Sequence, residues 1–178
     1  MLELVAPNPD MYEAFCELTD EWTDIGVTSH GMSMTVRPFA TRDEFVAWVD
    51  EMLSEDQVAQ PGRVTCSYYW AVEDGRIVGG ASLRHELNDY LLRAGGHIGY
   101  SVRPSARGRG IATCMTKLVI EQAAERGIER ALIVCDDDNP ASAAVIENCG
   151  GVLEDVRPYD PDAEVIELIR RYWVPTGM

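Results

Sequence analysis

The chain has 178 residues, of which 46% are hydrophobic, and this length suits one domain with a sizeable core better than two. Its formal net charge of −15 argues against nucleic acid as a partner, because binding to phosphate backbones needs a basic surface. The sequence has no apolar run of 18 residues and no charged start followed by an apolar stretch, so we expect one cytoplasmic domain over residues 1–178 that contacts no membrane.

The chain should begin with a short strand over residues 1–6, followed by a helix that ends near Gly26. Asn8 can cap this helix, with Pro9 in its first position. Its buried face would hold Met11, Phe15, Leu18 and Trp22. Residues 1–60 contain 13 Asp and Glu and only two arginines. This charge could attract a cationic amine, although general solvation of the surface is the simpler explanation.

A second helix is predicted to start at Thr41, which forms a capping box with Glu44. Apolar side chains then follow at helical spacing: Phe45, Trp48, Val49, Met52 and Leu53. Residues 27–40, before this helix, show no clean period and predict a loop. The polar segment 54–63 after it contains a Pro-Gly turn and predicts a mobile connection.

A β-hairpin should come next. Side chains alternate from Cys66 to Val72, Asp74-Gly75 supplies the turn, and residues 77–83 form the returning strand. The polar cluster 84–93 follows, between two central strands, where an acceptor could approach. A helical turn capped by Asn88 explains the cluster equally well.

Residues 97–127 predict a strand, a glycine-rich turn and a long helix, around which the rest of the chain is arranged. Ile98, Tyr100 and Val102 alternate as one face of a strand, and Pro104 ends it because proline has no N–H for the ladder. The helix after the turn has apolar residues at positions 111, 115 and 118, with Gln122 as the polar exception.

The turn of this unit predicts an anion site. Gly108 and Gly110 let backbone N–H groups approach an anion, and the first turn of the helix adds unpaired N–H groups and a partial positive charge. Arg107 and Arg109 add full charges with forked donors. The pattern favours a pyrophosphate, while a surface turn with two arginines for solubility is the alternative.

Two other phosphate motifs do not fit. The sequence has no GxxxxGK[ST] run, and the dinucleotide fingerprint GxGxxG is met at Gly108 and Gly110 but fails at Thr113. The site is therefore neither a P-loop nor an ordinary dinucleotide site.

The last third predicts a buried strand, a helix and two closing strands. Residues 131–135 are continuously apolar and suit a strand covered on both faces. Three aspartates, 136–138, end it, and a solvated turn explains them more simply than a cation site. A helix from about Pro140 should stop at Gly150-Gly151. The closing strands should cover residues 152–156 and 164–173.

Two blocks carry a resemblance. The R-x-x-G-x-A pattern of Arg107, Gly110 and Ala112, after an extended V-x-P, resembles the acyl-CoA-binding motif of the GNAT superfamily of N-acetyltransferases. Asn139-Pro140-Ala141-Ser142 followed by Glu147-Asn148-Cys149-Gly150-Gly151 resembles that superfamily's N-x-A-S…E-x-x-G segment, at the right spacing. The segments RHELN and GGHIGY also resemble a subset of GNAT proteins.

The resemblance implies an α/β (α+β) fold with a central mixed, mostly antiparallel sheet flanked by helices. The sheet would splay open between the strands at 97–103 and 131–135, and the pantetheine arm of acetyl-CoA would lie in the splay. Backbone groups of Ser101 and Val102 would contact the arm. The residues that would hold the pyrophosphate are Arg107, Gly108, Arg109, Gly110, Ile111, Ala112 and Thr113. Asn139 and Ser142 would contact the pantetheine from the other wall.

The implied chemistry is direct acetyl transfer to the amine of a small molecule or peptide, with acetyl-CoA as co-substrate and no metal. A base must deprotonate the ammonium, and His97 is the candidate, because many relatives carry a glutamate there and an imidazole titrates near the required pH. A histidine hydrogen-bonded within the sheet is the equal alternative, and His85 or Glu86 is the reserve.

One departure from the superfamily concerns the leaving thiolate. Many members carry a tyrosine as its acid, where this chain has Ile146. An acyl-CoA-binding module without turnover and an O-acyltransferase therefore stay open as alternatives. The sequence also leaves open the acceptor, the acyl chain length and whether the protein forms a homodimer.

Overall fold

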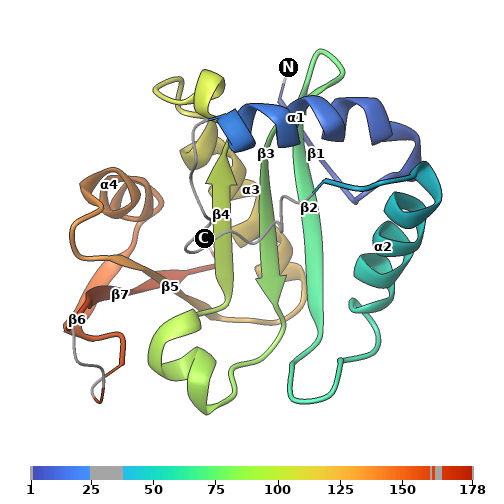
Figure 1. Ribbon diagram of the computed structural model, residues 1–178. Helices are drawn as coiled ribbons and strands as arrows, with labels where there is room; N and C mark the ends of the chain where they lie inside the picture. Colours follow the sequence, from blue (N-terminus) through green and yellow to red (C-terminus); the bar gives the residue numbers. More distant parts are fainter. Residues whose placement is uncertain (1, 25–37, 161, 163–165, 178) are drawn as a thin grey trace.

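The computed structural model describes residues 2–24, 38–160, 162 and 166–177. Seven strands form one sheet in the order β1-β2-β3-β4-β5-β7-β6 (Figure 1). They are β1 (Glu3–Val5), β2 (Cys66–Glu73), β3 (Arg76–Arg84), β4 (Ile98–Val102), β5 (Arg130–Asp136), β6 (Val152–Pro158) and β7 (Leu168–Pro175). The α-helices are α1 (Tyr12–Asp24), α2 (Arg42–Ser54), α3 (Ile111–Glu125) and α4 (Pro140–Asn148).

The sheet is mixed and splays open at its centre. Every strand pair is antiparallel except β4 and β5, whose parallel pairing consists of the single pair Ile98 and Ile133. Beyond that pair β5 turns away from β4, as Figure 1 shows. The mixed, mostly antiparallel sheet with a central splay, which the resemblance implies, is thus confirmed.

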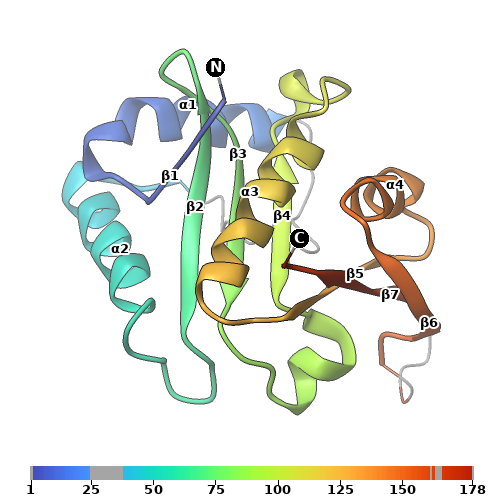
Figure 2. The ribbon, with the colours of Figure 1, turned by 180° about the vertical axis from the view of Figure 1, so that it is seen from behind.

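Helices cover both faces of the sheet and bury two clusters. Helices α1 and α2 lie on the face turned to the viewer in Figure 1, and α3 lies on the face seen in Figure 2. Phe15, Phe45 and Trp70 anchor the cluster under α1 and α2. Met115 and Val119 of α3 belong to the cluster on the other face. Among the described helices, none is long and apolar enough to cross a membrane.

The helix starts follow the predicted caps. The side chain of Asn8 accepts the N–H of Asp10, but it opens a short 3-10 turn (Pro9–Met11) that leads into α1. Thr41 Oγ1 accepts the N–H of Glu44 at 3.2 Å and caps α2. Most of the predicted 27–40 loop lies outside the described residues.

Two predicted helix-face residues and one predicted strand end are wrong. The buried face of α3 runs through Met115, Val119 and Ala123, so Leu118 lies at its margin. Leu53, expected on the buried face of α2, is exposed. Strand β7 reaches Pro175 rather than 173, because its ladder with β5 continues to the pair of Arg130 and Pro175.

Candidate functional site

The glycine-rich turn forms a cradle at the start of α3. Gly108 and Gly110 have φ values of +74° and +77°, which L side chains rarely adopt, and a Cβ on either would point into open space. The first helical hydrogen bond runs from the N–H of Cys114 to the C=O of Gly110, at 3.0 Å. The N–H groups before it have no acceptor within the helix, so they can bind an anion together with the helix dipole.

Both arginines of the turn contact the protein. The Arg107 guanidinium lies over the Trp22 ring, 5.2 Å from its centroid, and its Nε donates to the C=O of Val102 at 3.1 Å. Arg109 Nη2 lies 2.6 Å from Glu73 Oε2. The free hydrogen-bond donors of the turn are therefore its backbone N–H groups. The arginines add positive charge, which Glu73 partly neutralises.

The edge of β4 next to this turn is unpaired. The N–H of Arg103 donates to Val78 on β3, and alternation along the strand then directs the backbone groups of Ser101 toward β3 as well. Those of Tyr100 and Val102 face the opposite side, where the described part of β5 provides no partner. The open edge can therefore hydrogen-bond an extended ligand through the backbone groups of Tyr100 and the N–H of Val102 rather than through Ser101, since the C=O of Val102 already accepts Arg107 Nε.

The second motif block closes the splay from the other side. Asn139 Oδ1 accepts the N–H of Ser142 at 3.0 Å and so caps α4. Ser142 Oγ lies 2.7 Å from the Tyr100 hydroxyl. Burial raises the pKa of Tyr100, so the phenol keeps its proton. The sequence could not show that Tyr100 reaches α4, because the contact joins residues 42 positions apart.

His97 is placed within the sheet. Its ring Nδ1 accepts the backbone N–H of Leu132 at 2.9 Å, and the backbone N–H of His97 donates to the C=O of Leu132 at 2.7 Å. The side chain is 7% exposed. Burial, followed by the charge of Arg84, lowers the pKa of His97 to about 4. The neutral ring then has its only lone pair engaged, a geometry that favours the alternative of a histidine hydrogen-bonded within the sheet.

His85, the reserve candidate, lies beside a serine and an aspartate. Ser67 Oγ donates to Asp56 Oδ1 at 2.5 Å and lies 2.7 Å from His85 Nε2. Because the serine has one proton, the histidine must donate to it. Ser67 thus lacks a base for nucleophilic attack. Arg126 also pairs with Asp56, so the cluster joins the ends of α2 and α3 to β2. Glu86, the other reserve candidate, is exposed beside it.

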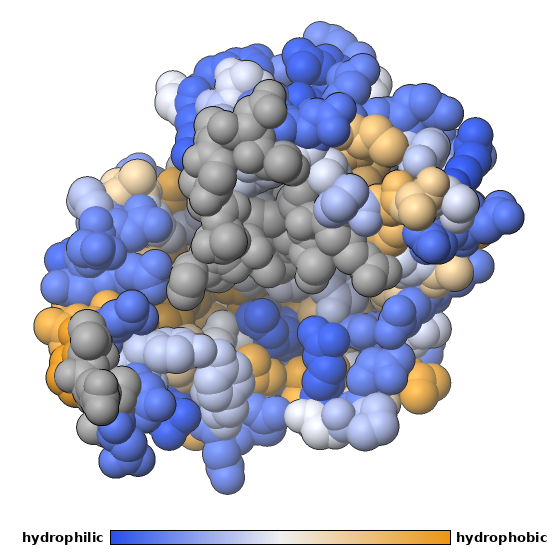
Figure 3. Space-filling view, viewed as in Figure 1, coloured by the Kyte–Doolittle hydropathy of each residue, from blue (hydrophilic) through white to orange (hydrophobic). Residues whose placement is uncertain are grey.

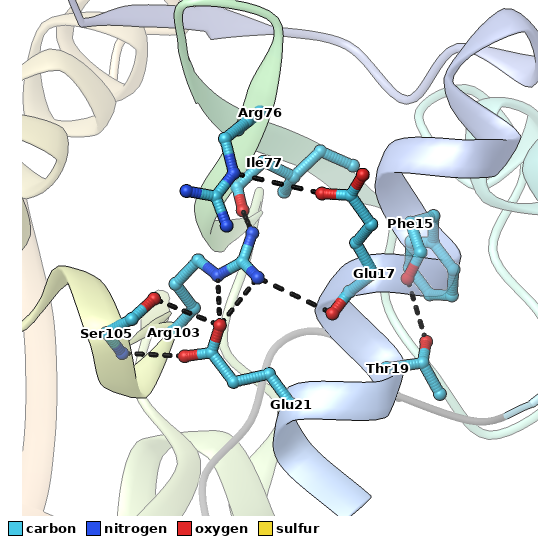
Figure 4. Close-up of polar contacts among 8 residues, drawn as sticks. All are labelled: Phe15, Glu17, Thr19, Glu21, Arg76, Ile77, Arg103 and Ser105. Atoms are coloured by element: carbon cyan, nitrogen blue, oxygen red, sulfur yellow. Dashed lines mark hydrogen bonds and ion pairs between the residues drawn. The ribbon is translucent and has the colours of Figure 1, made fainter.

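A buried arginine fixes the approach to the turn (Figure 4). Arg103 is 3% exposed, and its Nε and Nη2 donate to Glu21 Oε2 of α1 at 2.8 and 2.6 Å. The N–H and hydroxyl of Ser105 donate to the same carboxylate. Burial alone would raise the pKa of Glu21, but Ser105 and Arg103 together hold it below its usual value. This network joins α1 to the segment that leads into the anion cradle.

A cavity of about 330 Å³ opens on the face that carries α2. Its walls come from α2, residues 62–64, the start of β2, the end of β3, and residues 88–91. Ser82 lies on its β3 wall, in register with Gly99 on β4, one strand from the open edge. Neither His85 nor His97 lines it. Most of the surface around this face is hydrophilic (Figure 3).

The site thus has two sides. One has free backbone N–H groups at a helix N-terminus and a strand edge without a strand partner, and the other is the cavity on the face that carries α2. Among the described residues, no group of three or more His, Cys, Asp or Glu side chains could hold a metal ion.

The family model for the acetyltransferase (GNAT) domain matches residues 2–152. No curated protein matches the chain.

Solved structures share the fold at low identity. Microcin C7 self-immunity acetyltransferase MccE, in complex with acetyl-CoA and AMP, is 20% identical with a TM-score of 0.70, over 98% of this chain and 92% of that chain. The ribosomal α-N-protein acetyltransferase RimL, in complex with coenzyme A, is 23% identical with a TM-score of 0.70, over 98% and 93%. Spermidine N-acetyltransferase SpeG from Vibrio cholerae is 14% identical with a TM-score of 0.64, over 98% and 95%.

Proposed function

The chain belongs to the acetyltransferase (GNAT) domain family, and we propose that it is an N-acetyltransferase that moves the acetyl group of acetyl-CoA directly to an amine in a ternary complex. The observation that carries the proposal is the β4–α3 unit, in which an unpaired strand edge leads straight to an anion cradle. This order matches a ligand with an extended, amide-bearing arm that ends in a pyrophosphate.

Each part of coenzyme A can be assigned a set of residues. In our proposal the N–H groups from Gly108 to Thr113 hold the pyrophosphate, and the open edge of β4 at Tyr100 and Val102 pairs with the pantetheine amides. Asn139 and Ser142 contact the arm from the α4 side. The thioester supplies the activated acetyl group when acetyl-CoA is bound. A backbone N–H of the edge aimed at its carbonyl oxygen would lower the barrier by about 3 kcal/mol.

We propose a source for the proton of the leaving thiolate that the sequence did not reveal. Ile146, at the position where many relatives carry a tyrosine, is fully buried in the core. Tyr100, by contrast, reaches across the splay to Ser142. We assign the donor role to its hydroxyl, which stays protonated because burial raises its pKa. The acceptor amine enters from the 330 Å³ cavity beside α2, on the face of the sheet opposite α3, which we call the acceptor cavity.

Release of free thiol tests the proposal. The protein should release coenzyme A from acetyl-CoA in the presence of some member of a panel of small amines and N-terminal peptides, and the acetylated amine should appear in equal amount. Tight acetyl-CoA binding without release for any amine would instead identify a binding module. Release with alcohols only would identify an O-acyltransferase.

The role of His97 can be decided by a pH profile. We expect His97→Ala to lower the free energy of unfolding by about 1–3 kcal/mol, because the buried N–H of Leu132 loses its acceptor. The acid limb of the kcat/KM profile should keep its midpoint in the variant. A limb that disappears or moves would restore His97 as the catalytic base.

His97 also makes a prediction for the wild-type protein. Its folded pKa lies below that of the unfolded chain, so the unfolded state binds the proton more readily. The histidine's contribution to stability should therefore be present above pH 6.5 and be lost as the pH falls from about 6.5 to about 4. Urea unfolding of wild type and His97→Ala across this range measures that share.

A further inference from the structure

Arg84 is a half-buried cation on the wall of the acceptor cavity. Its Nη1 donates to the C=O of Gly95 at 3.1 Å and of Gly96 at 3.2 Å. Among the described residues, no carboxylate lies within ion-pair distance of it. In a chain with a net charge of −15, a guanidinium without an anionic partner needs an explanation.

The polar segment after β3 holds this arginine in place. Asn88 Oδ1 accepts the N–H of Leu91 and caps the short helical turn Leu91–Gly95. The turn ends at Gly96, whose φ of +66° and contact with Leu132 exclude a side chain, since a Cβ would lie 2.6 Å from that carbonyl oxygen. The carbonyls of Gly95 and Gly96 therefore point at Arg84. The predicted helical turn capped by Asn88 is confirmed, and its carbonyls fix a cation.

The anchor uses only one edge of the guanidinium. With Nη1 bound to two carbonyls, the Nε and Nη2 edge has no partner among the described residues. That edge carries the two parallel N–H donors that match a carboxylate. Two residues earlier on the same face of β3, the Ser82 hydroxyl is 1% exposed and has no hydrogen-bond partner in the described structure. The cavity wall thus holds three donors that have no acceptor in the described part of the chain: Arg84 Nε, Arg84 Nη2 and the Ser82 hydroxyl.

Carboxylates at and just after the end of α2 also line the cavity. Glu55 Oε2 accepts from the Tyr68 hydroxyl at 2.7 Å, and Oε1 lies 3.6 Å from Arg63. Glu51 is a second, exposed carboxylate. These carboxylates attract an ammonium group but repel a dianion such as phosphate. A ligand with one carboxylate and one ammonium group satisfies both the donors of Arg84 and Ser82 and these carboxylates.

We propose that Arg84 and Ser82 bind the carboxylate of the acceptor, which is therefore an amine of the amino-acid class. This inference rests on the proposed function, because the cavity must deliver the amine to the thioester. Ser82 is in register with Gly99, the first residue of β4 beyond the single pair with β5. An acceptor anchored on this wall lies one strand from the open edge, within reach of the splay.

The rival explanation is a purely structural arginine. A single Arg84 nitrogen, Nη1, already binds the two carbonyls. A purely structural arginine would therefore leave its Nε and Nη2 edge, and the Ser82 hydroxyl, without partners among the described residues. A carboxylate on that edge satisfies all of them. The two explanations differ in substrate preference, which a structural arginine would not set.

The test compares matched acceptors. Thiol release from acetyl-CoA is measured with the common L-amino acids, with the corresponding carboxamides and with the decarboxylated amines. For the best amino acid, kcat/KM should exceed that of its amide and its decarboxylated amine by about 10- to 100-fold. Equal rates within a matched set, or release only from amines without a carboxylate, would overturn the inference and leave acetyl transfer standing. Release with no amine at all would defeat the proposed function itself.

Variants assign the preference to the residue. Arg84→Gln should reduce the amino-acid preference to about 3-fold or less, mainly through KM, and Arg84→Lys should restore part of it. Arg76→Gln, at the exposed start of the same strand, should keep the full preference. Acetyl-CoA affinity, measured in the same variants, should stay at the wild-type value and reports that each is folded. An undiminished preference in Arg84→Gln would overturn the assignment.

Discussion

Replacing Gly110 with Glu should abolish acetyl-CoA binding, with an affinity at least about 100-fold below the wild type in calorimetric titration. The new side chain would begin at the cradle, in space that is open in the structure, and carry a negative charge to the place where the pyrophosphate goes. It would also remove the favourable field that the helix N-terminus offers an anion.

Gly127 provides the matched control at the other end of α3. Its φ of +78° equals that of Gly110 within a degree, and a Cβ there also meets open space. Gly127→Glu therefore carries the same backbone strain, about 1–2 kcal/mol, and the same charge. It should bind acetyl-CoA as the wild type does. Equal losses in both variants, or unchanged affinity in Gly110→Glu, would remove the pyrophosphate from this turn.

Replacing Glu21 with Ala should lower the free energy of unfolding by about 3–5 kcal/mol, because it leaves the buried guanidinium of Arg103 without its counter-charge. Urea unfolding at neutral pH measures the loss. In the wild type the folded pKa of Glu21 is depressed, so its contribution is present above the unfolded pKa near 4.5 and is lost as the pH falls through the folded value.

Glu17, one turn earlier on α1, is the control. Its carboxylate meets only the exposed Arg76, at 3.8 Å, while its backbone C=O accepts from Arg103 and is untouched by a side-chain change (Figure 4). Glu17→Ala should cost about 0.5 kcal/mol or less. The double variant Glu21→Ala/Arg103→Met, which buries no charge, should recover part of the loss. A Glu21→Ala protein as stable as Glu17→Ala would contradict the proposed importance of the buried pair.

The parts of the site that the sequence predicted are local. The strand, the two glycines and the start of α3 follow one another directly, so spacing and backbone preferences are enough to place the cradle. The cap of α4 by Asn139 and the hairpin between β2 and β3 are local in the same sense. Each depends on residues a few positions apart or on a tight turn.

The parts that the sequence missed depend on tertiary contacts. The sequence left His97 equally open as a base or as a histidine hydrogen-bonded within the sheet, and the contact that favours the second comes from the N–H of Leu132, 35 positions away. Burial also disfavours the charged form of His97 by lowering its pKa. Tyr100 meets Ser142 only because the sheet splays and α4 packs across the gap. The role proposed for Arg84 rests on its having no carboxylate partner among the described residues, which only the folded arrangement reveals. In the sequence, Arg84 was marked only as part of the polar cluster 84–93 between two central strands.

The central claim is that the β4–α3 unit binds acetyl-CoA, and the most direct measurement is calorimetric titration with acetyl-CoA, coenzyme A and ATP in separate runs. The structure predicts one site per chain for acetyl-CoA and coenzyme A and no binding of ATP, because the open edge of β4 recognises the pantetheine arm that ATP lacks. Binding of ATP as strong as that of coenzyme A, or binding of neither thioester nor thiol, would contradict the account.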